Sequence, residues 1–462
     1  MEACGPRRHP LLLPVDQVYA CHAAAMVHHR MGWSHHEVGH VDIKRLRQTF
    51  DAAMSCGFQL PITPSSATCS TGAAVAAASP TTHASVIIVG AGASGLATAA
   101  ALRRKGVHDV IVLEKNSKVG GSWARQYDSL CITTRKRHCT LPGYAVPDEY
   151  PVTLDAASFL QYLSDYAARY HIKPKFDCEV LSTSSGSGKD GCPRVTLGTS
   201  LGTFHCDALV VATGKHSQPR MPADVVEVLR NFQGPVLHST ELRRGAWGPM
   251  ADLLGAESGV MQSGQVCIVG MGNSACDLAI ELVKRGTGKV IISVRAAPPI
   301  IMREWGPLSL EWVTKLLAQY LPASFGDFMI DLAGKLRWGW NWRETVFPRD
   351  ALSQSWQACK TSRVPVIDKG DLVDNLLKKR RLSVRPSIIG SSSGALQFSD
   401  SGEWFNFDAV ILATGFEQAW HGITAGAGVH MVGFENGKAL IPLLQIGKDA
   451  QAAAKAIAKA VR

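Results

Sequence analysis

No stretch of about 20 residues in this 462-residue chain is apolar enough and free enough of charge to span a bilayer, so no membrane-spanning helix is expected. None of its 12 cysteines forms a Cys-X-X-Cys pair, which argues against a redox-active dithiol. The formal charge of +10 comes from scattered basic residues without a nucleic-acid-binding motif, so no nucleic-acid partner is expected. No signal peptide is visible either, and we therefore expect reduced cysteines in an intracellular compartment.

Charged residues are also missing from Ala52 to Ser85, and residues 1–84 hold 8 of the 16 histidines. We interpret residues 1–84 as a low-complexity leader, either a disordered tail or a targeting segment, and a protein start at Met54 fits as well. Five of the histidines lie close together, but no helical or zinc-finger spacing among them supports a defined site, so no metal site is predicted. They are His28, His29, His35, His36 and His40. The cytoplasm is the first expectation for localisation, with a plastid and the endoplasmic reticulum surface as alternatives.

Two glycine-rich turns of one kind stand out among the features that are present. GAGASG and GMGNSA each follow a strand-like apolar run and lead into an apolar helical stretch, which is the context of a dinucleotide-binding turn. In such a turn the first glycine allows a tight bend, the second lets the backbone approach a pyrophosphate, and the third position permits close helix packing. The pyrophosphate lies at the helix N-terminus. The candidate contacts are Gly90, Gly92, Ser94 and Gly95 in the first turn and Gly270, Gly272, Asn273 and Ser274 in the second.

The residue about 20 positions after each turn distinguishes the two nucleotides. Glu114, followed by Lys115, ends the next strand of the first repeat, and its carboxylate can accept hydrogen bonds from the ribose hydroxyls of FAD. Arg295 holds the same place in the second repeat, where a guanidinium can pair with the 2'-phosphate of NADPH. A pair of solvated strand-end charges is the simpler alternative.

The repeat continues in the strands DALVVATG and DAVILATG, each of which closes one half. Their last residues are further candidate cofactor contacts, namely Thr213, Gly214, Thr414 and Gly415. The duplication predicts an α/β protein with two Rossmann-like dinucleotide-binding domains, for FAD and NADPH, the second inserted in the first. The predicted bounds are 84–221 with 416–462 for the FAD domain and 222–415 for the NADPH domain. The substrate should meet the flavin at the interdomain cleft.

Residues 308–356 are not accounted for by the nucleotide domains. Their apolar residues fall at helical spacing, so we expect a helical insertion near the cleft. Trp338, Trp340 and Trp342 lie in it, interleaved with Arg337 and Arg343. These tryptophans fit an aromatic substrate wall, plain core packing or docking on a membrane surface, and peripheral membrane association is an alternative rather than the expectation.

The chain resembles the class B flavin-dependent monooxygenases, also called the flavin-containing monooxygenase family, from about Ser85 to its C-terminus. The motifs that carry this resemblance are GAGASG, GGSWARQYDSL, LPGYAVPDEYP, ATGKHSQPRMP, FQGPVLHS, GMGNSACDLA, ILATGF and LIPLLQIGKDAQ. Within that family the chain is most similar to the plant YUCCA-type indole-3-pyruvate monooxygenases, which belong to auxin biosynthesis.

This resemblance implies that NADPH reduces bound FAD and that O2 then forms a C4a-hydroperoxyflavin, which oxygenates a small organic substrate. It further implies that Gly120, Gly121 and Trp123 belong to the loop over the flavin and that Gln445 lies beside the cofactor. No catalytic side chain is certain, because the flavin carries the chemistry. Thr133 and Thr134 are candidates, since they stand about where microsomal-type members carry an asparagine that contacts flavin and NADP.

Three activities stay open. They are oxidative decarboxylation of indole-3-pyruvate to indole-3-acetate, N- or S-oxygenation of the microsomal type, and a non-oxygenating NADPH oxidase or redox-sensing function. Leu242 leaves room for the last, because the fingerprint that begins with FQGPVLH has an aromatic residue there in the family. A keto acid would need a cationic partner for its carboxylate, for which Arg343 and Arg349 are candidates.

Overall fold

The computed structural model describes residues 81–127, 129–187, 193–242, 264–305, 308–309, 323–353, 366–378, 381–417, 428–434 and 442–461. By its internal contacts the chain divides into two compact units, Met1–Ala77 and Ala78–Arg462, and all described residues belong to the second. The predictions made for residues 1–80, including those for the five clustered histidines, lie outside these ranges. Within them, no helix has both the length and the apolar character that crossing a membrane requires.

The first sheet runs in the order β2-β1-β5-β4-β3, with the short strand β20 added beside β5. Its parallel part is buried on both faces, which is why β1 and β5 contain unbroken apolar runs. The strands are β1 Thr82–Val89, β2 Val110–Leu113, β3 Val180–Ser187, β4 Pro193–Thr199, β5 Gly202–Val211 and β20 Val429–Met431. Thr82 pairs with Phe204, so β1 begins three residues before Ser85, where the apolar run of the sequence begins.

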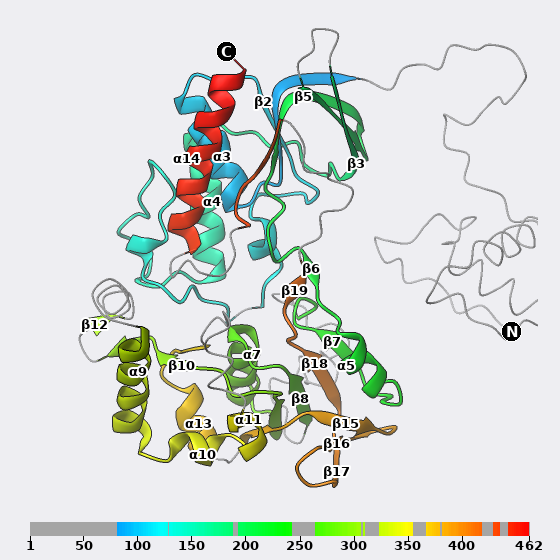
Figure 1. The fold of residues 1–462 in the computed structure, drawn as a ribbon, viewed down its shortest axis with the longest axis vertical. Helices are drawn as coiled ribbons and strands as arrows, with labels where there is room; N and C mark the ends of the chain where they lie inside the picture. Colours follow the sequence, from blue (N-terminus) through cyan, green and yellow to red (C-terminus); the bar gives the residue numbers. More distant parts are fainter. Residues whose placement is uncertain are drawn as a thin grey trace, which may run out of the picture. The chain divides into compact units, whose positions relative to one another are not determined.

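Three helices cover one face of this sheet, α3 Ala93–Arg104, α4 Ala156–Arg169 and α14 Pro442–Ala460. Figure 1 shows α14 alongside α3, although the two are separated by most of the chain. The first ten residues of α3 are buried, because this helix is packed between the sheet and its neighbours. The carboxylate of Asp155 begins α4 by accepting the Ser158 N–H at 2.7 Å. Short 3-10 segments lie between β2 and α4, η1 Gly121–Arg125 and η2 Lys136–His138.

The second sheet is parallel throughout, in the order β14-β9-β8-β18-β7. Its strands are β7 Val236–His238, β8 Gln265–Val269, β9 Lys289–Ser293, β14 Leu382–Arg385 and β18 Ala409–Leu412. One face packs on α7 Asn273–Lys284 and α13 Leu372–Lys378. The other packs on an antiparallel sheet of β15 Ile388–Ser391, β16 Ala395–Phe398 and β17 Trp404–Asn406, near the short helix α5 Ala223–Val228. The chain enters this sheet after β5 and leaves it after β18, so the second sheet is an insertion in the first.

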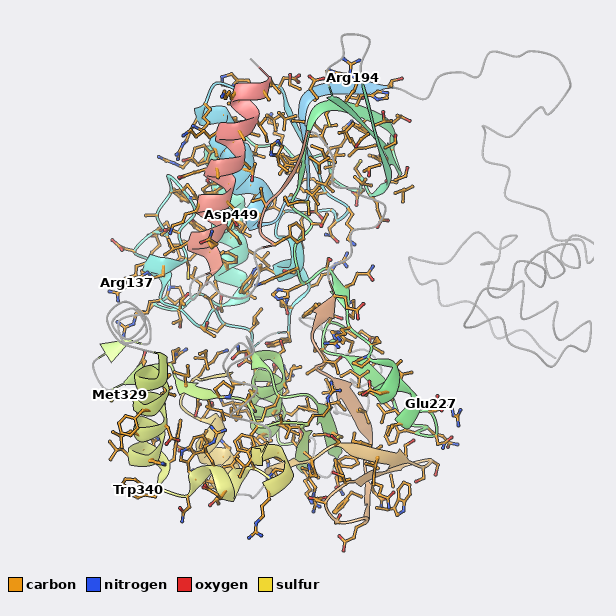
Figure 2. The ribbon with its side chains drawn as sticks, viewed as in Figure 1. Arg137, Arg194, Glu227, Met329, Trp340 and Asp449 are labelled. Atoms are coloured by element: carbon orange, nitrogen blue, oxygen red, sulfur yellow. The ribbon has the colours of Figure 1, made fainter. Side chains whose placement is uncertain are left out.

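The described part of the segment between β9 and β14 is largely helical. It contains α9 Ala323–Trp338, α10 Trp342–Val346 and α11 Arg349–Ser353, with the short strands β10 Ile300–Met302, β11 Glu304–Trp305, β12 Leu308–Ser309 and β13 Val366–Asp368. Trp342 is 3% exposed and lies in the core of the second sheet, with Trp338 packed against it at 5.0 Å. Trp340, labelled in Figure 2, is 67% exposed. Core packing therefore accounts for Trp342, whereas Trp340 faces solvent.

The two passages between the sheets are tied to each other. β6 Gln218–Pro219 pairs with β19 Phe416–Glu417. The carbonyl oxygen of Gly415 accepts hydrogen bonds from the Arg220 N–H and from Nε2 of His238, both at 3.0 Å. The Thr414 hydroxyl donates to the Arg220 carbonyl in return. The histidine of the FQGPVLH segment thus holds the returning strand in place.

Acid is expected to loosen this crossover. Nε2 of His238 donates to a carbonyl and Nδ1 accepts from the Thr240 N–H at 3.3 Å, so the ring is neutral. Burial is the main cause that lowers the pKa of His238 below its ordinary value. A lowered folded-state pKa contributes stability above the unfolded value of about 6.5, and that stability is lost as the pH falls through the folded-state pKa.

The measurement is Tm from pH 8 to pH 5 for the wild type and for His238→Gln. The amide can still donate to the Gly415 carbonyl but does not titrate, so the variant should lose less stability on the acid side. Equal acid-side slopes for the two proteins would contradict the assignment.

Candidate functional site

The first glycine turn is built so tightly that two of its positions exclude any side chain. Gly90 has φ +110°, and a Cβ there would lie 2.5 Å from the carbonyl oxygen of Ala212 at the end of β5. A Cβ on Gly95 would lie 1.9 Å from the Gly90 carbonyl oxygen. The strand end, the turn and the start of α3 are therefore in direct backbone contact.

Gly92 is different, because its backbone is ordinary and its surroundings are open. Its φ is −82°, and a Cβ at this position would have the Gly121 Cα, at 3.7 Å, as its nearest neighbour. No side chain caps α3 at this residue, so the first N–H groups of the helix face that space. Ser94 is buried in the first turn of the same helix. An open, uncapped helix N-terminus fits a pyrophosphate.

The second turn repeats this arrangement. Gly270 has φ +101°, and its Cβ would lie 2.7 Å from the Ala413 carbonyl oxygen at the end of β18. A Cβ on Gly272 would have no atom within 4 Å, and no side chain caps α7 there either. Asn273 is partly engaged, since its Oδ1 accepts the Ile367 N–H at 2.8 Å. The structure therefore shows two equivalent spaces, one at the start of each helix.

The charged residues that follow the two turns, Glu114 and Arg295, differ in their burial and in their partners. Glu114 is 4% exposed and fastens the first turn, with Oε2 accepting the Ala91 N–H at 2.7 Å and Oε1 accepting the Asn116 N–H at 3.0 Å. Lys115 is exposed. Arg295 is exposed just beyond β9 and pairs with Asp224 at 3.3 Å. Their nucleotide contacts stay predictions, and the structure adds that Asp224 competes for the Arg295 guanidinium.

The two Ala-Thr-Gly strand ends are not equivalent. The hydroxyl oxygen of Thr213 is buried and has no hydrogen-bond partner among the described residues, whereas that of Thr414 is used within the crossover. Gly214 and Gly415 both have positive φ, +82° and +87°, with open space where a Cβ would be. An unsatisfied buried hydroxyl is uncommon in folded proteins. The Thr213 hydroxyl is therefore available to form a hydrogen bond on the side of the first sheet.

The loop assigned to the flavin lies directly on the first turn. The Gly120 N–H donates to the Ala91 carbonyl at 3.2 Å, and a Cβ on Gly121 would come within 3.2 Å of the Gly92 Cα. Trp123 follows in η1 and packs edge-on against Phe159 at 4.7 Å. The indole is therefore partly buried against the core of the first sheet, and its contact with the flavin stays a prediction.

The start of α14 also reaches this region. A Cβ on Gly433 would lie 2.1 Å from the Ser94 Oγ and 3.9 Å from Ile446, so these residues are neighbours. Gln445 precedes Ile446, and its amide donates to Asp449 at 2.7 Å (Asp449 is labelled in Figure 2). Its place beside a cofactor stays a prediction.

Several other candidates have structural surroundings of their own. Thr134 is buried with its hydroxyl 3.4 Å from the Cys139 sulfur, and Thr133 is half-buried. Cys131 and Cys139 both carry reduced thiols. The Arg343 guanidinium lies over the rings of Trp342 and Phe347, at 5.3 and 5.6 Å, and Arg349 is exposed.

The fingerprint segment has a packing role at each of its defining positions. Phe232 is buried between the second sheet and the antiparallel sheet. Gly234 has no room for a Cβ, which would lie 2.8 Å from the Asp408 carbonyl oxygen. Leu242, at the position where the family has an aromatic residue, is fully buried in the core of the second sheet.

Sequence reasoning missed a buried polar group that joins the two sheet assemblies. The Tyr127 hydroxyl donates to Asp277 at 3.1 Å, and the Lys369 ammonium donates to the same carboxylate oxygen at 2.8 Å. Burial raises the pKa of Asp277, opposed by Lys369, and burial together with Asp277 raises the pKa of Tyr127. The signal that could have found it is the pair Asp277 and Glu281, spaced four apart within the otherwise apolar residues 275–283 of α7.

Two Rossmann-like halves, each with a dinucleotide turn, define the chain as an oxidoreductase of the two-dinucleotide flavoprotein class. Residues 83–424 match the sequence profile of the family described as "Flavin-binding monooxygenase-like". The chain therefore belongs to the flavin-binding monooxygenase-like family.

Named relatives agree with this assignment. The chain is 31% identical over 339 residues to the probable indole-3-pyruvate monooxygenase YUCCA3 of Arabidopsis thaliana, covering 71% of this chain and 72% of the relative. It is 31% identical over 331 residues to the indole-3-pyruvate monooxygenase YUCCA1 of Oryza sativa subsp. japonica, covering 71% and 76%. This protein is thus an NADPH-dependent flavin monooxygenase with FAD and NADPH as its cofactors.

Solved structures confirm the predicted fold class. A flavin-containing monooxygenase from Stenotrophomonas maltophilia superimposes with a TM-score of 0.58 at 19% identity, covering 81% of this chain and 98% of that one. A steroid monooxygenase bound to NADP superimposes with a TM-score of 0.57 at 19% identity, covering 77% and 75%. The residues present fit both cofactors, because Gly92 and Gly272 each leave an open helix N-terminus and Thr213 offers an unsatisfied hydroxyl.

Residues 10–60 match a second profile, described as "CER1-like, C-terminal domain". These residues lie outside the described ranges. The match covers 51 residues and falls within residues 1–84, whose interpretation as a leader stays a prediction.

Replacing Gly92 by valine should leave the protein folded and remove its flavin. The backbone at Gly92 suits any residue and a Cβ has room, but the side chain would fill the space at the start of α3. We expect a normal circular dichroism spectrum and a colourless protein. Gly95→Ala is the matched comparison, because its clash with the Gly90 carbonyl should lower Tm instead. A Gly92→Val protein that purifies yellow would refute the pyrophosphate assignment.

Replacing Arg295 by alanine should weaken the binding of NADPH much more than that of NADH, because only NADPH has the 2'-phosphate. The KM for NADPH should rise by about tenfold. Asp224→Asn should instead lower the KM for NADPH slightly, since it frees the guanidinium from its 3.3 Å partner. Steady-state kinetics with both coenzymes measure the two effects. An equal loss for NADPH and NADH in Arg295→Ala would rule out the phosphate contact.

Proposed function

We propose that this monooxygenase catalyses the oxidative decarboxylation of a 2-keto acid, indole-3-pyruvate, to indole-3-acetate and CO2, with NADPH and O2 as co-substrates. The observation that supports this substrate most directly is the 31% identity, over about 71% of the chain, to relatives named indole-3-pyruvate monooxygenases. An auxin-forming role follows from the same likeness.

We further propose the placement of the cofactors. The FAD pyrophosphate lies at the start of α3, with Glu114 on its ribose and the Gly120–Trp123 loop over the ring. The NADPH pyrophosphate lies at the start of α7, with Arg295 on the 2'-phosphate. The FAD domain then comprises residues 84–221 and 416–462, and the NADPH domain residues 222–415. Bound FAD supplies the redox and oxygen chemistry, which the side chains do not.

This chain's own residues have three tasks in that scheme. The uncapped helix N-termini bind the pyrophosphates through their N–H groups and dipoles. The tied crossover at His238 and Gly415 orients one nucleotide site relative to the other. The buried Thr134 and the partly buried Trp123 limit the access of water, which otherwise promotes loss of peroxide.

The main competing activity is a non-oxygenating NADPH oxidase, and Leu242 is the residue that favours it. Leu242 is fully buried in the core of the second sheet, at the position where the family fingerprint has an aromatic residue. The N- or S-oxygenating alternative shares all the cofactor contacts and differs only in its substrate.

Rapid mixing of the NADPH-reduced protein with O2, with and without indole-3-pyruvate, separates these activities. An oxygenase should show a delay before the oxidised-flavin absorbance returns, and the keto acid should shorten it with formation of indole-3-acetate. A delay shortened by an amine or a sulfide and not by the keto acid would move the protein to the N- or S-oxygenating class. Immediate return with stoichiometric H2O2, whatever the substrate, would identify an oxidase.

A further inference from the structure

The segment that follows the flavin loop is buried in the other half of the molecule. η1 ends at Arg125, and two residues later Tyr127 is 2% exposed within the hydrophobic core of the second sheet. Leu130 packs against the same core. The loop that contacts the first turn through Gly120 and Gly121 is therefore anchored, at its far end, in the second-sheet assembly.

The anchor is polar and is concentrated on one helix. Tyr127 donates to Asp277, which Lys369 also contacts, and the side chains of Asp277 and Lys369 are 10% and 18% exposed. One helical turn further along α7, the Ser129 hydroxyl donates to Glu281, whose other oxygen accepts from Arg285 at 2.6 Å. Asp277 and Glu281 are four residues apart and thus share one face of α7.

This contact lies close to the proposed NADPH end of α7. The helix begins at Asn273, so Asp277 is about 6 Å along its axis. Ser274, a predicted NADPH contact, is near enough to the Tyr127 hydroxyl to act on its pKa, which it lowers against the larger effect of burial. A displacement at the start of α7 therefore reaches Tyr127 through a single side chain, and through Tyr127 the loop that lies on Gly92.

We propose that Tyr127, Ser129 and α7 form a coupling contact that positions the dinucleotide helix against the flavin loop for hydride transfer, with Tyr127 and Asp277 as positioning residues. The proposal rests on the cofactor placement given under Proposed function. Stability alone is a weak reason for the contact, because a buried ion pair is often no more stabilising than apolar residues of the same volume. A directional hydrogen bond fixes how the loop and the helix are aligned with each other, and it does so more strictly than apolar packing.

Tyr127→Phe is the sharpest variant, because it removes one hydroxyl while Asp277 keeps its Lys369 partner and the aromatic ring stays in the core. Tyr150→Phe is the matched control. It removes a similar hydrogen bond, Tyr150 to Asp165 at 3.0 Å, that stays within the first-sheet assembly. Ser129→Ala removes the second contact, and the Tyr127→Phe/Asp277→Asn double variant tests whether the two residues act as one unit.

The measurement is the rate of flavin reduction by NADPH without oxygen, in the purified full chain, together with Kd for NADPH, flavin content and Tm. Tyr127→Phe should reduce flavin about three- to tenfold more slowly, the factor expected from one ordinary hydrogen bond, with Kd changed less than about twofold. Tyr127→Phe/Ser129→Ala should be slower still, and Tyr127→Phe/Asp277→Asn no slower than the slower single variant.

The outcomes separate the coupling contact from the function on which it rests. If NADPH does not reduce the bound flavin of the wild-type protein, the cofactor placement is wrong, and this proposal is overturned with it. A wild type that reacts while Tyr127→Phe reacts equally fast overturns the coupling contact alone. A loss of rate in Tyr127→Phe that merely follows a loss of Tm or flavin, or that Tyr150→Phe matches, assigns Tyr127 to structural support and also overturns the proposal.

Discussion

The fold depends on two contacts in which a glycine stands against the end of a strand. Gly90 touches Ala212, and Gly270 touches Ala413, each at a distance that would force any Cβ into a carbonyl oxygen. Both glycines also have positive φ, so no other residue suits them. The contacts draw strand, turn and helix together and leave the helix N-terminus open where Gly92 or Gly272 stands. An uncapped helix start with room beside its glycine is the direct consequence.

The two halves share this backbone arrangement but differ in the side chains around it. Glu114 is buried and uses both oxygens to hold its turn, whereas Arg295 is exposed and meets only Asp224. The hydroxyl of Thr213 is left without a partner among the described residues, whereas that of Thr414 serves the crossover. A rigid site that recognises a retained cofactor and a more open site that exchanges its coenzyme are consistent with these differences.

The sequence predicted the features that arise from local spacing. In each half the glycine turn and the strand-end charge lie within about 25 residues of each other, and the closing strand is recognised by its own Ala-Thr-Gly ending, which recurs in both halves. It could not assign the three tryptophans, because burying Trp342 and exposing Trp340 depends on how α9 and α10 pack. Tyr127 and Asp277 are 150 residues apart, and no spacing rule relates a loop tyrosine to a helix carboxylate at that separation.

The two connections between the halves differ in kind, and the difference suits a two-cofactor enzyme. At the crossover a neutral imidazole and backbone groups meet around Gly415, and the nearby charges of Arg220 and Glu417, 4.0 Å apart, are more than half exposed and therefore screened by water. At α7 the connection passes through Asp277 and Lys369, charges with little exposure to water, where a nearby phosphate is weakly screened. The coenzyme's charge should therefore act more strongly on the second connection than on the first, because the charges of the second are the less screened.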